Sequence, residues 1–270
     1  MKTIASTIFA SLLAAAASAA DNSNLVIPPL ESKADLPEKM LVLIPGANVA
    51  TSYYSDTAAA IQEATDLNLW VVIPEIADKL CISVCPSSGT CFHLQGDVDK
   101  VLGMAQEQGY AGPTDGEGIF MSGHSLGATC ADNLARGYEG KYQALITMGG
   151  YTADQDVAGA PFPLLTLGAE LDGGLGRPGN LYKSIVSSDT WAATNGGLNS
   201  AAHVTQKPVV ILPGADHSDF CPGFQVPGDI YPSELTKDQA MTEIGDKVSA
   251  FLNVQAGVSV SESVKKLQDG

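Results

Sequence analysis

The sequence predicts an α/β protein with a doubly wound, mostly parallel sheet. Two observations indicate this: apolar runs of strand length that are continuous rather than alternating, and helical patterns between most of these runs. Continuous hydrophobicity is typical of strands covered on both faces, as in a parallel sheet, and alternating strands and helices build a doubly wound domain. The expected strands lie at residues 40–44, 69–73, 118–121, 145–148, 163–167 and 209–212.

The clearest helical patterns cover residues 54–65, 94–108, 126–138 and 237–252. The stretch 21–38 is short and rich in proline, so it has room for one edge strand at most, and we expect the sheet to be reduced at its amino-terminal edge. A Gly/Ser/Thr-rich connection at 173–206 is longer than an ordinary loop and is a candidate cap or lid over the site.

The first twenty residues have the pattern of a secretory signal peptide. Lys2 precedes an apolar stretch at 4–17, and small residues lead up to Asp21, which predicts cleavage after Ala19 or Ala20. The apolar stretch is shorter than the ~20 residues that a membrane-spanning helix needs. We therefore expect a secreted, extracellular protein without stable membrane insertion, with residues 21–270 forming a single domain.

The formal net charge of −16 and the lack of a basic cluster argue against a nucleic-acid partner. The sequence has no H-E-x-x-H, phosphate-binding loop or dinucleotide fingerprint, so no metal or organic cofactor is expected. We expect the chain to act alone, as a monomer.

Five cysteines in an exported chain predict disulfides and one leftover thiol. We expect Cys130 to be unpaired, because it lies on the small-residue helix where a buried thiol acts as a small hydrophobe. Cys81, Cys85, Cys91 and Cys221 then allow three pairings. One hypothesis is a bridge from the 81–91 segment to Cys221 that clamps the loop after the last strand.

The most informative motif is Gly123-His124-Ser125-Leu126-Gly127, which follows one expected strand and opens the next helix. In that context a G-x-S-x-G serine sits on a sharp, strained turn and becomes a nucleophile. Glycines are needed at both flanks because neighbouring backbone passes close to them.

A serine hydroxyl needs a base to take its proton, and His217 has the right position for this role at the carboxyl end of the last expected strand. His124 lies inside the turn, where its side chain should point away from the serine's partner. The other two histidines, His93 and His203, lie in a helix start and in the long connection.

The base needs a carboxylate to orient it, and Asp172 is favoured because it follows the preceding strand in a turn closed by Gly173. Glu170 and Asp216 are weaker alternatives. In the resulting order, Ser125, Asp172 and His217 follow different strands of the sheet, taken in chain order.

The developing oxyanion of acyl transfer needs amide donors. Leu126, the residue after the nucleophile, supplies one. Ala47, in the turn after the first strong strand, is expected to supply the second, and Gly46 lets that backbone approach closely.

On these motifs, the chain resembles the α/β-hydrolase superfamily across roughly residues 40–252, and within it the lipases and esterases of the chlorophyllase and dienelactone-hydrolase-like type. The resemblance implies that Ser125 is acylated, that His217 acts as general base and then acid, and that Asp172 orients it. The Pro45-Gly46 turn and the cysteine-bearing insert at 81–91 depart from the subfamily pattern.

The sequence therefore predicts a secreted carboxylic-ester hydrolase that takes a small-molecule or lipid-like ester. Tyr53 and Phe220 are the favoured substrate-binding aromatics, since they lie nearest the oxyanion turn and the base. The alternatives are an acyltransferase or peptidase on the same triad, and a binding protein on a hydrolase fold without catalysis.

Overall fold

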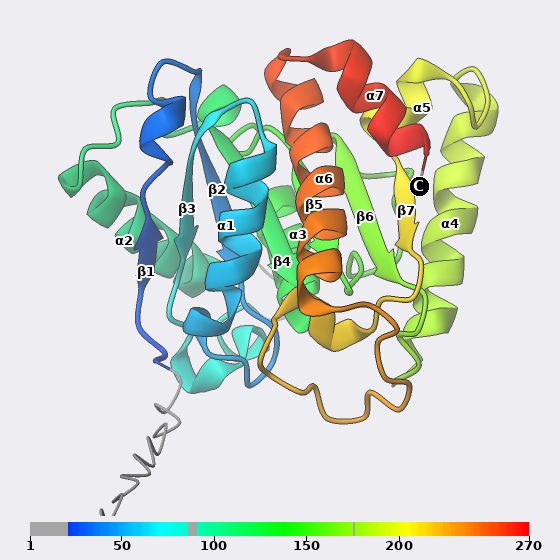
Figure 1. Cartoon of the computed structure of the whole chain (residues 1–270), viewed down its shortest axis with the longest axis horizontal. Coiled ribbons are helices and arrows are strands. Elements are labelled where there is room, and N and C mark those ends of the chain that lie inside the picture. Colours follow the sequence, from blue (N-terminus) through cyan, green and yellow to red (C-terminus); the bar gives the residue numbers. More distant parts are fainter. Residues whose placement is uncertain (1–20, 86–90, 175, 270) are drawn as a thin grey trace, which may run out of the picture.

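A seven-stranded sheet forms the centre of the molecule, with the strand order β1-β3-β2-β4-β5-β6-β7 (Figure 1). The computed structural model describes residues 21–85, 91–174 and 176–269, so the predicted signal peptide lies outside the described residues. The strands are β1 (Leu25–Ile27), β2 (Glu38–Ile44), β3 (Asn68–Ile73), β4 (Ile119–His124), β5 (Leu145–Met148), β6 (Leu164–Ala169) and β7 (Val209–Leu212).

Strands β2 to β7 are parallel to their neighbours, and only the three-residue β1 pairs antiparallel, with β3. The doubly wound, mostly parallel sheet is confirmed, and it is short at the amino-terminal edge as predicted. All six predicted strands are present. The parallel strands all end at the same edge, which is the lower edge in Figure 1 and is called the carboxyl edge below.

Helices cover both faces of the sheet. They are α1 (Ser55–Ala64), α2 (Phe92–Glu107), α3 (Leu126–Gly137), α4 (Arg177–Thr194), α5 (Ala201–Gln206), α6 (Lys237–Ala256) and α7 (Val260–Gln268). One core cluster joins α1 and α6 to one face through side chains such as Ile61 and Phe251. The other joins α2 and α3 to the opposite face through side chains such as Val98 and Leu134. Figure 1 shows α1 and α6 in front of the sheet and α2 behind it.

The ends of α6 illustrate how local sequence sets helix limits. Thr236 and Gln239 form a reciprocal capping box that satisfies the first backbone N–H groups. The helix stops at Gly257, whose φ of 75° is left-handed and therefore favours glycine. Helix α7, which sequence analysis did not predict, packs against α6 and buries Leu267.

The connection predicted as a possible cap, 173–206, contains α4 and α5. Pro178 fits the first turn of α4, where a missing N–H costs nothing. A Cβ on Gly168 of β6 would meet the Leu181 side chain at 3.0 Å, so α4 lies directly against the sheet. Most of this segment therefore belongs to the helical layer beside β6.

Candidate active site

Ser125 lies on a strained turn between β4 and α3. Its φ of 54° and ψ of −124° are unusual for a residue with a side chain. A Cβ on Gly123 would lie 2.3 Å from the Gly127 carbonyl oxygen, and one on Gly127 would lie 2.2 Å from the Ile44 carbonyl oxygen. The expectation that only glycine fits at both flanks is thus confirmed, and the serine is left partly exposed at the carboxyl edge.

The turn after β2 lies against this serine. A Cβ on Gly46 would be 3.2 Å from the Ser125 Cβ. The neighbouring Asn48 N–H donates to the Lys79 carbonyl at 2.8 Å, which anchors the turn. Ala47 and Leu126 are both partly exposed, and within the described residues neither backbone N–H has a hydrogen-bond acceptor. Neither amide is therefore committed to a partner within the protein in these described ranges.

The structure brings His217 and Asp172 together at the ends of β7 and β6. His217 Nδ1 lies 2.8 Å from Asp172 Oδ2, and both side chains are buried. The two alternative acids are engaged elsewhere. Glu170 accepts the Gly214 N–H at 2.8 Å, and Asp216 caps its own turn by accepting the Asp219 N–H at 3.0 Å.

A pair of glycines after β5 packs against both Ser125 and His217. A Cβ on Gly150 would lie 2.3 Å from the Ser125 carbonyl oxygen, and one on Gly149 would lie 3.0 Å from His217 Nδ1. No hydrogen bond joins the Ser125 and His217 side chains in the described part of the chain, and His217 Nε2 is buried without a partner. Such contacts often tighten only when substrate is bound.

His124 points into the protein, and sequence reasoning missed what it does there. The Tyr54 hydroxyl accepts the Gly46 N–H at 2.7 Å and lies 2.9 Å from His124 Nδ1. The His124 ring packs on the His217 ring with centroids 4.7 Å apart. Burial, and then the neighbouring His217, hold the pKa of His124 well below its usual value, so its ring is neutral. A neutral Nδ1 can accept a hydrogen bond from the Tyr54 hydroxyl, which links the turn after β2 to the serine turn.

Of the two predicted substrate-binding aromatics, one is misplaced. Phe220 has no exposed surface, because its ring packs under the histidines, with its centroid 5.7 Å from that of His124. It therefore has no surface through which a bound ligand could contact it. Tyr53 is half-buried and packs against Phe224 with the two rings tilted, their centroids 5.4 Å apart.

The expectation that Cys130 is the unpaired cysteine is wrong. The disulfides are Cys81–Cys130 and Cys85–Cys91, and the free thiol is the buried Cys221. Helix α3 turns Cys130 toward the segment after β3, where Cys81 Sγ also lies 3.5 Å from the Leu126 carbonyl oxygen. The clamp from the 81–91 segment to the loop after β7 therefore does not exist. Cys221 faces the core instead, where burial raises the pKa of its thiol to about 12.

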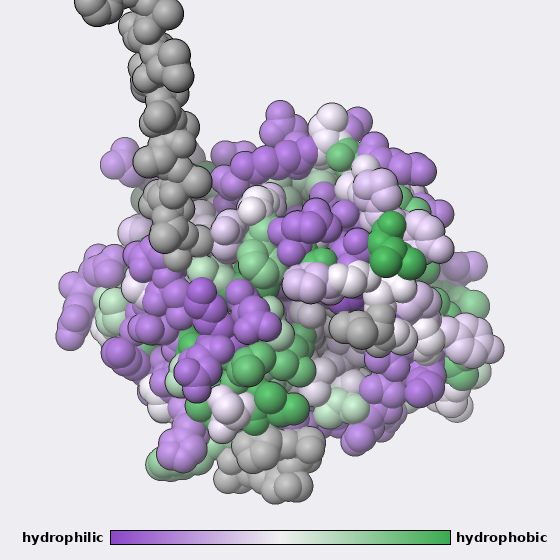
Figure 2. Space-filling view, turned by 90° about the horizontal axis from the view of Figure 1, so that it is seen from below, coloured by the Kyte–Doolittle hydropathy of each residue, from purple (hydrophilic) through white to green (hydrophobic). Residues whose placement is uncertain are grey.

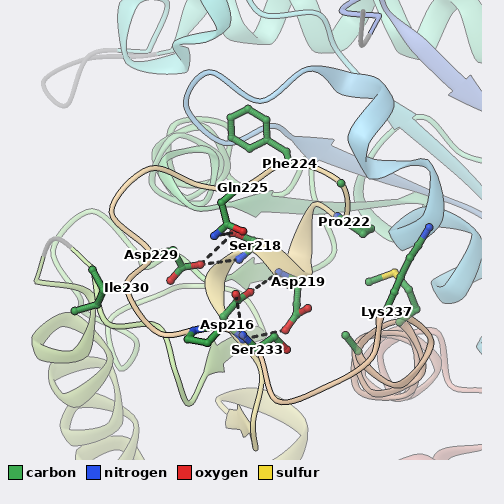
Figure 3. Close-up of a pocket in the computed structure, with 14 residues that line it drawn as sticks. Asp216, Ser218, Asp219, Pro222, Phe224, Gln225, Asp229, Ile230, Ser233 and Lys237 are labelled. Carbon is green, nitrogen blue, oxygen red and sulfur yellow. Dashed lines mark hydrogen bonds between the residues drawn. The ribbon is translucent and has the colours of Figure 1, made fainter. Parts of the chain in front are cut away.

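The carboxyl edge carries apolar surface and a nearby pocket. Figure 2 shows green, apolar residues among the purple ones on this face, and Ile82 and Ile230 are 51% and 65% exposed. A pocket of about 610 Å³ lies beside the His217 loop, and Ser125 does not line it. Figure 3 shows its walls, which include Asp216, Ser218, Asp219, Phe224, Asp229 and Lys237.

No group of three or more His, Cys, Asp or Glu side chains among the described residues is arranged to hold a metal ion. No helix in the described ranges is long and apolar enough to cross a membrane.

Comparisons with known proteins find similarity in structure only. No protein-family model matches the sequence, and no curated protein does. A putative dienelactone hydrolase from Klebsiella pneumoniae is 13% identical with a TM-score of 0.54, covering 86% of this chain and 99% of that one. Est1E from Butyrivibrio proteoclasticus is 14% identical with a TM-score of 0.51, covering 87% and 94%. FphF, a fluorophosphonate-binding serine hydrolase from Staphylococcus aureus, is 13% identical with a TM-score of 0.51, covering 85% and 92%. At these identities the likeness is one of fold.

Proposed function

We propose that this chain, which has the α/β-hydrolase fold, is an exported serine hydrolase that cleaves carboxylic esters through an acyl-enzyme. The observation that carries the proposal is the buried His217–Asp172 hydrogen bond at the same sheet edge as the strained Ser125 turn. A buried carboxylate on Nδ1 leaves Nε2 of the imidazole available as the base. The apolar leader at residues 1–20 supports export.

In the proposed reaction, Ser125 Oγ attacks the ester carbonyl carbon while His217 Nε2 takes the hydroxyl proton. The backbone N–H groups of Ala47 and Leu126 donate to the resulting oxyanion. Collapse of the tetrahedral intermediate breaks the bond to the alcohol, which leaves with the proton from His217. Water then attacks the acyl-enzyme in the same way and releases the acid. Asp172 keeps the imidazole oriented and stabilises its positive charge throughout.

The surroundings of the serine favour an apolar ester. Ile82, on the segment that the Cys81–Cys130 disulfide ties to α3, is exposed, and Tyr53, which follows the turn after β2 in the chain, packs against Phe224. Apolar side chains around a few polar donors are the usual composition of a small-molecule site. We propose Tyr53 as a substrate contact.

The deciding experiment is labelling of the purified protein with a fluorophosphonate, followed by peptide mapping and by hydrolysis of nitrophenyl esters of graded acyl length. We expect labelling at Ser125 that is lost in Ser125→Ala. Ser122→Ala is the matched control, because Ser122 lies on β4, the strand that leads into the Ser125 turn, with its hydroxyl donating to the Val42 carbonyl. A folded wild-type protein that neither labels nor hydrolyses any ester contradicts the proposal.

A further inference from the structure

A buried arginine joins the candidate acid to a second buried carboxylate. Arg177, the first residue of α4, donates through Nε to Asp172 Oδ1, on the opposite oxygen from His217. Its Nη2 lies 3.9 Å from Asp229 Oδ1. The side chains of Asp172 and Asp229 are 2% and 0% exposed, and that of Arg177 is 10% exposed. One guanidinium thus faces two carboxylates from different loops.

The second carboxylate holds the backbone that follows the base. Asp229 lies in the rim loop, residues 222–235, and its Oδ2 accepts both the backbone N–H and the hydroxyl of Ser218, each at 3.1 Å. Ser218 follows His217 directly in the chain. Figure 3 shows these bonds as dashed lines between the rim loop and the turn after β7. Asp172 therefore holds the His217 ring, and Asp229 holds its backbone.

The loops that carry the two carboxylates also come into close contact at glycine residues, which have no side chain to keep them apart. A Cβ on Gly174 would lie 2.7 Å from the Gly228 carbonyl oxygen and 2.3 Å from Arg177 Nη2. One on Gly173 would lie 2.5 Å from the Tyr231 ring. This close approach places the guanidinium between the acid turn and the rim loop.

Stability alone is a weak reason for such an arrangement. Taking a guanidinium and two carboxylates out of water costs several kcal/mol for each ion, and well-packed apolar residues are often as stabilising as a buried ion pair. What the guanidinium adds is direction, since its planar, rigid donors fix the orientation of Asp172, to which Nε donates. Its Nη2, 3.9 Å from Asp229 Oδ1, makes an ion pair with Asp229 and no hydrogen bond.

We propose that Arg177 is a positioning residue. Together with Asp229 it keeps both the ring and the backbone of His217 in the orientation that proton transfer requires. The proposal rests on the proposed function, because it assigns His217 as the base. Arg177 touches no reacting atom and acts through Asp172 and Asp229. The alternative is that the same contacts only stabilise the start of α4.

The kinetic test compares Arg177→Met, Arg177→Lys and Asp229→Asn with wild type on a nitrophenyl ester. For Arg177→Met we expect kcat to fall about 10²-fold, the effect of a small misplacement of a catalytic group, with KM within about threefold. Arg177→Lys keeps the positive charge but lacks the planar guanidinium, and its kcat should lie between those of Arg177→Met and wild type. In Asp229→Asn the side-chain oxygen can still accept a hydrogen bond from Ser218, so kcat should fall by about tenfold or less.

The double variant Arg177→Met/Asp229→Asn should be no slower than Arg177→Met, because both residues act through one unit. The matched control is Arg136→Met, which breaks a similar arginine pair, with the buried Asp132, on α3. We expect it to lose stability and keep kcat. The proposal is overturned if Arg177→Met keeps kcat within threefold of wild type, or if the two losses multiply in the double variant.

A readout independent of turnover separates this proposal from the proposed function. The proton between His217 Nδ1 and Asp172 should give a downfield NMR signal in wild type, weakened or lost in Arg177→Met and kept in Arg136→Met. Its persistence in Arg177→Met overturns the positioning role even if Ser125 is reactive. Its loss supports that role even if no ester is cleaved. Should Arg177→Met fail to fold, Arg177→Lys and Asp229→Asn give the same comparison.

Discussion

Replacing Gly149 by alanine tests the packing that holds His217 in place. Gly149 follows β5 with a φ of 53°, in the left-handed region. A Cβ there would lie 2.8 Å from Phe220 Cδ2 and 3.0 Å from His217 Nδ1, the atom that bonds to Asp172. Because Phe220 and His217 are both fully buried, neither ring has free space to move into.

The expected cost has two parts. The left-handed backbone costs a residue with a Cβ about 1 kcal/mol, and forcing extra volume into a packed core costs about 1–3 kcal/mol. The free energy of unfolding of Gly149→Ala should therefore fall by about 2–4 kcal/mol. Because His217 must shift, kcat should also fall, by about 10²-fold.

The assay combines urea unfolding with hydrolysis of a nitrophenyl ester by the folded variant. Gly140→Ala is the control, because Gly140 also has a left-handed φ, of 81°, but a Cβ there meets no atom within 4 Å. It should lose about 1 kcal/mol and keep its activity. Equal stability losses in the two variants, with kcat of Gly149→Ala unchanged, would refute the reasoning.

Two further predictions follow from the disulfides and from the buried His124. The Cys81–Cys130 bridge closes a loop with a sequence separation of 49, so replacing both residues by alanine should lower the free energy of unfolding by about 4 kcal/mol. The same change at Cys85–Cys91, with a separation of 6, should cost about 2 kcal/mol. If urea unfolding shows a larger loss for this variant than for the Cys81–Cys130 variant, the loop-entropy argument is contradicted. Burial keeps His124 neutral in the folded protein, whereas in the unfolded chain the same imidazole takes up a proton below its usual pKa of about 6.5. The free energy of unfolding should therefore be at its full value above about pH 6.5 and fall by up to about 1.4 kcal/mol per pH unit below it. Urea unfolding between pH 5 and 8 should show a shallower acid slope in His124→Asn, and an identical slope would mean that His124 does not carry the effect.

Much of the fold was predictable because it is encoded locally. Buried parallel strands need continuous apolar runs, and β5 and β7 coincide with the predicted runs at 145–148 and 209–212. Helix α7 was missed because it is short and mostly polar, and the contact that stabilises it is with α6. Helices α4 and α5 were read as a possible cap because Gly, Ser and Thr have low helix propensity, which packing against the sheet overrides.

Some features of the candidate site could likewise be predicted from the sequence, and others could not. The glycines around Ser125 and the placement of Asp172 and His217 after successive strands could be read from spacing, because parallel strands deliver their ends to one edge. The burial of Phe220 and the contacts of His124 could not, since both depend on what lies beneath the carboxyl edge.

By itself, the sequence determined the order of strands and helices, the strained turn at Ser125, and which loops reach the carboxyl edge. Only the tertiary structure decided that Asp172 rather than Glu170 or Asp216 meets His217, that Cys130 pairs with Cys81, and that Arg177 joins the acid turn to the rim loop. The reason is physical: turns and apolar runs depend on neighbours along the chain, whereas these pairings depend on side-chain directions set by packing between elements far apart in sequence.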